Sequence, residues 1–176
     1  SSTTLESWLS ALEASFVVFR LRPYTANVSK RLVKTPKVYF TEPGLVAWLL
    51  QIETPAQAAR DPLLGGLYEN LVIVEALKAA YNRGTDPRLS FYRDRTGLEV
   101  DLVHEVQRRP VAIEIKAAAT WSPEMARSLD AFARMVPAVA GRAIVYSGPA
   151  APAVSDVKIA NHAETATLLF GAAPTP

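Results

Sequence analysis

Apolar residues after position 66 switch between helical and strand-like spacing. The stretch LYENLVIVEALKAAY (67–81) has the apolar period of a helix, and Gly84 is suited to end it. A second helix is expected to begin with Ser122 as N-cap and Pro123 at the first helical position. Strand-like stretches lie at 89–94, 98–106, 111–117 and 142–148, and VKIANHAETATLLF is expected to add a last strand and a short helix. This order predicts an α/β fold in which helices flank a mixed sheet.

The first sixty residues follow a different pattern. Thr3 and Glu6 have the spacing of a capping box ahead of an amphipathic helix. SFVVFRLRPY and RLVKTPKVYF are typical of two short strands, and PGLVAWLLQI predicts a short buried helix. The connector at 53–66 is rich in Pro, Gly and Ala, so we expect one domain at residues 1–60 and another at 61–176. The tail GAAPTP is expected to be disordered.

Composition narrows the class of protein. The 176 residues are 49% hydrophobic, which is enough for a good core. Cysteine is absent, which excludes disulfides and thiolate metal sites and fits a reducing compartment, so we expect a cytoplasmic protein. The longest apolar run, GLVAWLLQI, is too short to cross a membrane. The chain begins with Ser1 rather than methionine, and we expect it to be part of a longer polypeptide.

Basic residues are concentrated in the predicted N-terminal hairpin. Six of them, and no acidic residue, occur from Arg20 to Lys37. A solvated hairpin would explain this pattern, and so would a surface that contacts phosphate groups or an acidic partner. The residues that we expect to contact a nucleic acid are Arg22, Lys30, Arg31 and Lys34, together with Arg93 and Arg95 in the turn FYRDRTG.

Charged residues also interrupt two of the apolar strands, where burial is costly unless the charges are paired. Asp101 lies between Val100 and Leu102, and Glu114 and Lys116 lie within VAIEIKAAA. If QRRP forms the turn and Val106 faces Val111, Asp101 lies directly across from Lys116 and diagonal to Glu114. All three side chains then share one face of the sheet, and a one-residue slip would separate them.

Two converging carboxylates suit a hard divalent cation such as Mg²⁺ or Mn²⁺. A lysine beside them can stabilise charge on a phosphate that is under attack by a metal-bound water. Glu69 lies on the apolar stripe of helix 67–81, so it packs against the sheet and needs a partner, either the same metal or Lys116. A plainer interpretation stays open, in which Asp101 and Lys116 form a cross-strand ion pair and Glu114 and Glu99 lie on a wet face.

These residues resemble the PD-(D/E)XK nuclease motif, with Asp101, then twelve residues, then Glu114-Ile115-Lys116. The blocks LVKTPKVYFTEPGLVAWLL, GGLYENLVIVEALK, FYRDRTGLEVDLV and AIEIKAAAT are similar to an uncharacterised C-terminal domain found behind AAA+-type ATPase modules. The resemblance implies a restriction-endonuclease-like fold preceded by a small winged-helix-like segment. It further implies an active-site set of Glu69, Asp101, Glu114 and Lys116, with Mg²⁺ or Mn²⁺ on Asp101 and Glu114. Val100 stands where the motif's proline would be.

Two functions follow from this resemblance, and the sequence leaves both open. In the first, the domain is a metal-dependent endonuclease that acts on DNA and is coupled to an ATPase module N-terminal to Ser1. In the second, it is a catalytically inactive module that binds DNA or a protein and regulates that ATPase. The sequence itself contains no G-x-x-x-x-G-K-[ST] phosphate loop, so an ATPase module would have to lie outside it.

Overall fold

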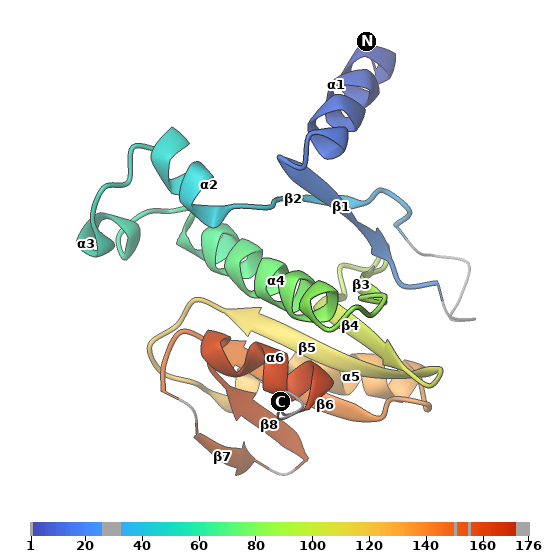
Figure 1. Cartoon of the computed structure of the whole chain (residues 1–176). Coiled ribbons are helices and arrows are strands. Elements are labelled where there is room, and N and C mark those ends of the chain that lie inside the picture. Colours follow the sequence, from blue (N-terminus) through green and yellow to red (C-terminus); the bar gives the residue numbers. More distant parts are fainter. Residues whose placement is uncertain (1, 26–32, 150, 155, 172–176) are drawn as a thin grey trace.

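The computed structural model describes residues 2–25, 33–149, 151–154 and 156–171. Within these ranges eight strands form one mixed sheet in the order β2-β1-β3-β4-β5-β6-β8-β7 (Figure 1). The strands are β1 Val18–Pro23, β2 Lys37–Phe40, β3 Leu89–Arg93, β4 Glu99–Val106, β5 Arg109–Lys116, β6 Gly141–Tyr146, β7 Ala151–Val154 and β8 Val157–Ala160. The predicted mixed sheet with flanking helices is confirmed. The short strand β7 was not anticipated.

Helices cover both faces of this sheet (Figure 1). The long helix α4 and the C-terminal helix α6 pack on one face, and α5 packs on the other. Their bounds, with those of the shorter helices, are α1 Ser2–Ala14, α2 Pro43–Leu49, α3 Pro55–Ala58, α4 Leu64–Asn82, η1 Pro123–Ala126, α5 Arg127–Met135, η2 His162–Glu164 and α6 Thr165–Phe170. None of the helices in the described ranges combines the length and the hydropathy that a membrane span needs. The cytoplasmic location stays a prediction.

The two-residue period of the strands divides the core into two layers. Leu102 and Ile113 point toward α4 and α6, where they meet Val72. Val103 and Ala112 point the other way, toward α5. Because the central strands are covered on both sides, β4 and β5 are apolar on both faces, which makes the charged residues within them conspicuous.

The hairpin between β4 and β5 is tighter than expected. Val106 pairs with Arg109, so the loop is Gln107-Arg108 and the predicted pairing of Val106 with Val111 is wrong. Both loop residues have positive φ, 50° and 63°, as a type I′ turn requires. A two-residue loop in place of a four-residue one moves the register by two positions. Because side chains alternate with period two, this shift leaves each residue on the same side of the hairpin.

The N-terminal segment is continuous with the sheet. Strand β1 pairs with β2 in an antiparallel sense and with β3 in a parallel sense through Arg22↔Ser90 and Pro23↔Phe91. The hairpin is therefore part of the same sheet as the predicted second domain. The domain boundary within 53–66 stays a prediction.

Two predictions about the N-terminal helices are wrong. Helix α2 has no buried residue, and Trp48 on it is 74% exposed. Its apolar run gave no information about which neighbours would cover it, and the helix lies beside the start of α4 rather than on the sheet (Figure 1). Helix α1 already begins at Ser2, so Thr3 lies within it and is not its cap. The predicted disordered tail lies outside the described residues, apart from Gly171.

Candidate active site

Asp101 lies where the pairing of β4 with both of its neighbours is interrupted. Toward β3 the strand has a bulge, because Asp101 and Leu102 together lie opposite the single residue Phe91. Toward β5 the regular pairing runs from Val106↔Arg109 to Leu102↔Ile113. One step further, Asp101 Oδ2 accepts a hydrogen bond from the backbone N–H of Ile115 at 2.9 Å. The carboxylate therefore takes over a hydrogen bond at the point where the two strands diverge.

The same register, continued by one residue, places Asp101 opposite Glu114 rather than opposite Lys116. Both carboxyl groups are buried, with exposures of 8% and 6%. Burial, reinforced by the charges of Glu114 and Glu69, raises the pKa of Asp101 to about 7, although the Ile115 N–H and Lys37 act to lower it. Asp101 consequently changes its charge near neutral pH, which is typical of residues at functional sites.

Glu114 is held from two sides. Its Oε1 lies 2.5 Å from Lys116 Nζ, and its Oε2 accepts a hydrogen bond from Ser128 Oγ of α5 at 2.6 Å. Burial lowers the pKa of Lys116, but the carboxylate of Glu114 outweighs burial, so the pKa is raised and Lys116 stays charged. The predicted Asp101–Lys116 pair is replaced by a Glu114–Lys116 pair within one strand. Ser128 was not identified from the sequence, where it is an ordinary helical serine.

Glu69 obtains a cationic partner, as its position on the apolar stripe of α4 requires, but that partner is Lys37. The Nζ atom of Lys37 lies 2.7 Å from Glu69 Oε1, 2.5 Å from Glu99 Oε1 and 3.7 Å from Asp101 Oδ1. Burial lowers the pKa of Lys37, but Glu69 and the other two carboxylates outweigh burial and raise it. Lys37 is therefore a partly buried ammonium group surrounded by three carboxylates.

Tyr39 completes this side of the site. Its hydroxyl donates a hydrogen bond to Glu69 Oε1 at 2.5 Å. Burial, reinforced by the charge of Glu69, raises the pKa of Tyr39 far above its ordinary value, so the phenol stays a donor. Lys37 and Tyr39 both lie on β2, so the residue patterns of β4 and β5 carry no information about them. The sequence does contain one indication of Lys37. It directly precedes the apolar run VYF, and a lysine that is buried together with such a run needs a partner of opposite charge.

The basic residues expected to contact a nucleic acid fall into three groups. Arg93 is engaged with Glu99 through two hydrogen bonds of 2.7 Å. The side chains of Arg22, Lys34 and Arg95 are exposed. Lys30 and Arg31 lie outside the described residues. The interpretation that places Glu99 on a solvent-exposed face is only partly right. Its side chain is 30% exposed, and its carboxylate contacts both Arg93 and Lys37.

Two carboxylates of this site, those of Asp101 and Glu114, are placed where they fit a divalent cation. Asp101 and Glu114 offer carboxylate oxygens from opposite positions on diverging strands, and Mg²⁺ is typically held by one or two carboxylates together with water and phosphate oxygens. Burial and then the charges of Glu114 and Glu69 raise the pKa of Asp101, and a bound cation would favour its ionised form. Within the described ranges, no three His, Cys, Asp or Glu side chains lie close enough to hold a metal ion by themselves. A cation at Asp101 and Glu114 would therefore need water or other oxygen ligands beside these two carboxylates.

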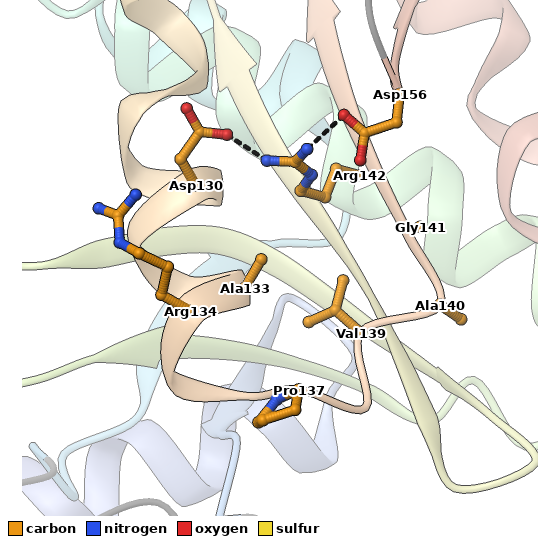
Figure 2. Close-up of a pocket in the computed structure, with 9 residues that line it drawn as sticks. All are labelled: Asp130, Ala133, Arg134, Pro137, Val139, Ala140, Gly141, Arg142 and Asp156. Atoms are coloured by element: carbon orange, nitrogen blue, oxygen red, sulfur yellow. Dashed lines mark hydrogen bonds and ion pairs between the residues drawn. The ribbon is translucent and has the colours of Figure 1, made fainter.

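A separate cavity of about 440 Å³ lies between α5 and β6 and shares no lining residue with this site (Figure 2). Arg142 is its central charged group and bridges Asp130 and Asp156. Two carboxylates pair with this guanidinium, and the other cationic side chain that lines the cavity, Arg134, is exposed. The acidic site around Asp101 is the stronger functional candidate.

The fold and the site thus define an α/β domain in which two buried carboxylates on the central strands β4 and β5 lie beside acidic and basic side chains from β2 and α4. The chain belongs to the family described as Domain of unknown function (DUF4143), whose model matches residues 64–165. Residues 1–56 match a second model, also described as Domain of unknown function (DUF8612). The candidate site draws on both segments, since Lys37 and Tyr39 precede residue 56 and the other members follow residue 64.

The curated relatives carry no functional name. Over 160 residues the chain is 35% identical to an uncharacterized protein of Mycobacterium tuberculosis and equally to one of Mycobacterium bovis. These matches cover 91% of this chain but only 35% of each relative, so the chain spans about a third of their length. No solved structure matches the chain significantly.

Proposed function

We propose that this domain is a nuclease-like module that hydrolyses phosphodiester bonds in DNA with the help of Mg²⁺ or Mn²⁺. The observation that carries the proposal is the placement of buried Asp101 opposite Glu114, where β4 and β5 diverge, with Lys116 on Glu114. The resemblance to the PD-(D/E)XK motif supports the same assignment, because it implies these three residues together with Glu69.

Each residue has a role that its contacts support. Asp101 and Glu114 would hold the cation, which supplies a metal-bound water of lowered pKa and neutralises phosphate charge. The Ile115 N–H and Ser128 Oγ fix the orientation of the two carboxylates. Lys116 places a positive charge beside Glu114, where it can stabilise a phosphate group. Glu69 has a positioning role in the metal-free site, because it holds Lys37 beside Asp101.

Metal binding and cleavage test this proposal together. The purified chain can be titrated with Mn²⁺ while electron paramagnetic resonance measures the free ion. We expect one binding site, and we expect Asp101→Asn to remove it. The same substitution is expected to abolish cleavage of branched, single-stranded or double-stranded DNA in the presence of Mg²⁺ or Mn²⁺. Asp130→Asn is the matched control, because Asp130 lies at the separate cavity and should leave both results unchanged. A wild-type chain that neither binds Mn²⁺ nor cleaves DNA would overturn the proposal.

One observation favours a second function, that of a catalytically inactive module that binds DNA or a protein. The carboxylates of the site are already engaged by Lys37, Lys116 and Arg93, so the cluster is held together without a metal. Under this alternative, DNA binding would weaken with salt and survive Asp101→Asn. It would be lost when Arg22, Lys30, Arg31 and Lys34 are neutralised together.

The larger context is a proposal of its own. The resemblance noted in the sequence implies an AAA+-type ATPase module in the same polypeptide, and the curated relatives are nearly three times as long as the matched region. We infer that this domain works with such a module. If the domain is catalytically inactive, its role would be to regulate the ATPase. A complete gene that encodes no phosphate-binding loop would contradict this part of the proposal.

A further inference from the structure

Lys37 is held in the acidic site from a strand at the edge of the sheet. Phe40, on the same strand, is fixed to the side chain of Asn70 on α4 by two hydrogen bonds. The Phe40 N–H donates to Asn70 Oδ1 at 2.9 Å, and Asn70 Nδ2 donates to the Phe40 carbonyl at 2.8 Å. These bonds place β2 next to Glu69, the residue that precedes Asn70. The Lys37 side chain is only 14% exposed, and its ammonium lies 5.5 Å from the centre of the Phe91 ring.

The two oxygens of Asp101 have different neighbours. Oδ2 accepts the hydrogen bond from the Ile115 N–H, and Oδ1 faces the ammonium of Lys37 at 3.7 Å. Within the part of the chain that the structure describes, Oδ1 accepts no hydrogen bond from the backbone, so an approach of a cation through Oδ1 leaves the bond to Ile115 intact. Mg²⁺ would lie about 2.0–2.1 Å from this oxygen. The ion and the ammonium would then share one oxygen, where their like charges repel each other strongly at a partly buried position.

We propose that Lys37 is the internal counter-ion of this site and that a divalent cation binds only by displacing its ammonium group from Asp101. This inference rests on the proposed metal-dependent function. The remaining partners suit such an exchange, because Glu69 keeps its hydrogen bond from Tyr39, and Glu99 keeps its two bonds from Arg93 when Lys37 leaves. Lys37 therefore sets the metal affinity of a site whose carboxylates lie on other elements.

A consequence follows for how the two matched segments cooperate. Lys37 lies within residues 1–56 and the carboxylates lie within 64–165, the ranges of the two family models. Any movement that draws β2 away from α4 would remove the counter-ion and favour metal binding. The N-terminal segment is in this sense a control element for the site, and Asn70 ties its strand β2 to α4.

Mn²⁺ titration of the whole chain tests the proposal. Lys37→Met keeps a side chain of similar length without the charge, and it is expected to bind Mn²⁺ at least about ten-fold more tightly than the wild type, because a like charge has been removed from beside the ion. Lys37→Arg retains the charge and should stay close to the wild type. Lys158→Met, at an exposed position on β8, is the matched control and should change nothing.

The outcomes separate this inference from the proposed function. If the wild type binds Mn²⁺ and Lys37→Met binds it no more tightly, the counter-ion role is overturned and the metal site stands. If neither chain binds Mn²⁺, both proposals fail.

A second measurement uses the wild type alone, so it does not depend on the folding of a variant. Acetylation of Lys37, followed by mass spectrometry, is expected to become several-fold faster when Mn²⁺ is added, because the amine is released from its carboxylates. The acetylation rate of Lys158 serves as the internal reference. An unchanged rate at Lys37 under conditions where Mn²⁺ is bound would overturn the displacement.

Discussion

Asp101 accepts a hydrogen bond from the backbone N–H of Ile115, so a side chain on one strand satisfies the backbone of the next. The arrangement gives Asp101 a structural role in addition to its proposed role as a metal ligand. The two roles can be separated, because an asparagine retains a carbonyl oxygen for the N–H and an alanine does not.

Asp101→Ala should therefore destabilise the protein more than Asp101→Asn. Leaving the buried Ile115 N–H without an acceptor costs about 1–3 kcal/mol. The comparison is best made by urea denaturation near pH 5.5, where wild-type Asp101 is largely protonated because burial raises its pKa to about 7. Equal free energies of unfolding for the two variants would show that the hydrogen bond contributes nothing.

The free energy of unfolding should depend on pH through the ionisation of Asp101. Burial raises its pKa in the native protein to about 7, from an ordinary value of 3.8. Between these values the native protein holds a proton that the unfolded chain has released, so the free energy of unfolding falls as the pH rises. The wild type should lose about 4 kcal/mol relative to Asp101→Asn between pH 4 and pH 8. Urea denaturation of both proteins across this range measures the difference, and parallel curves would contradict it.

Asn70 is expected to be essential for the attachment of β2. Asn70→Ala removes both hydrogen bonds to Phe40 and should lower the free energy of unfolding by about 2 kcal/mol or more. Asn82→Ala is a matched control, because Asn82 is exposed at the end of the same helix. Hydrogen exchange provides the local measurement, since the Phe40 amide should exchange much faster in Asn70→Ala. Unchanged protection would mean that β1 alone holds β2.

The β4–β5 turn is a place where stability can be gained. Arg108 has a φ of 63°, in the left-handed region that favours glycine. Arg108→Gly should raise the free energy of unfolding by about 1 kcal/mol or less, after allowance for the flexibility of glycine in the unfolded chain. Arg109→Gly, one residue later and within β5, should instead destabilise the protein. Thermal denaturation of the two variants gives the comparison, and equal effects would contradict the turn geometry.

The order of strands and helices could be read from the sequence because it depends on local periodicity. The apolar period of α4 and the alternation of β4 and β5 persist in the fold with small changes in their bounds. The register of the β4–β5 hairpin could not be read with the same certainty. The turn contains neither Asn nor Gly, so nothing in QRRP marked Gln107-Arg108 as the two-residue loop.

The site was predicted less completely than the fold, for a physical reason. Asp101, Glu114 and Lys116 lie on adjacent strands of one hairpin, so strand alternation brings them together even when the register is wrong by two. Lys37 comes from more than sixty residues upstream of Asp101, and its place depends on how β1 and β2 join the sheet. Local patterns do not encode that docking.

The continuity of the sheet has a practical consequence for anyone who would trim the chain to the family model at 64–165. Removal of the N-terminal segment would strip β1 from β3 and leave a free strand edge, which is a template for self-association. Removal of the C-terminal segment would delete nearly all of α6, whose Leu169 is buried in the core. Such a fragment would precipitate more readily than the whole chain. Any metal affinity measured on it would describe an acidic cluster that lacks Lys37.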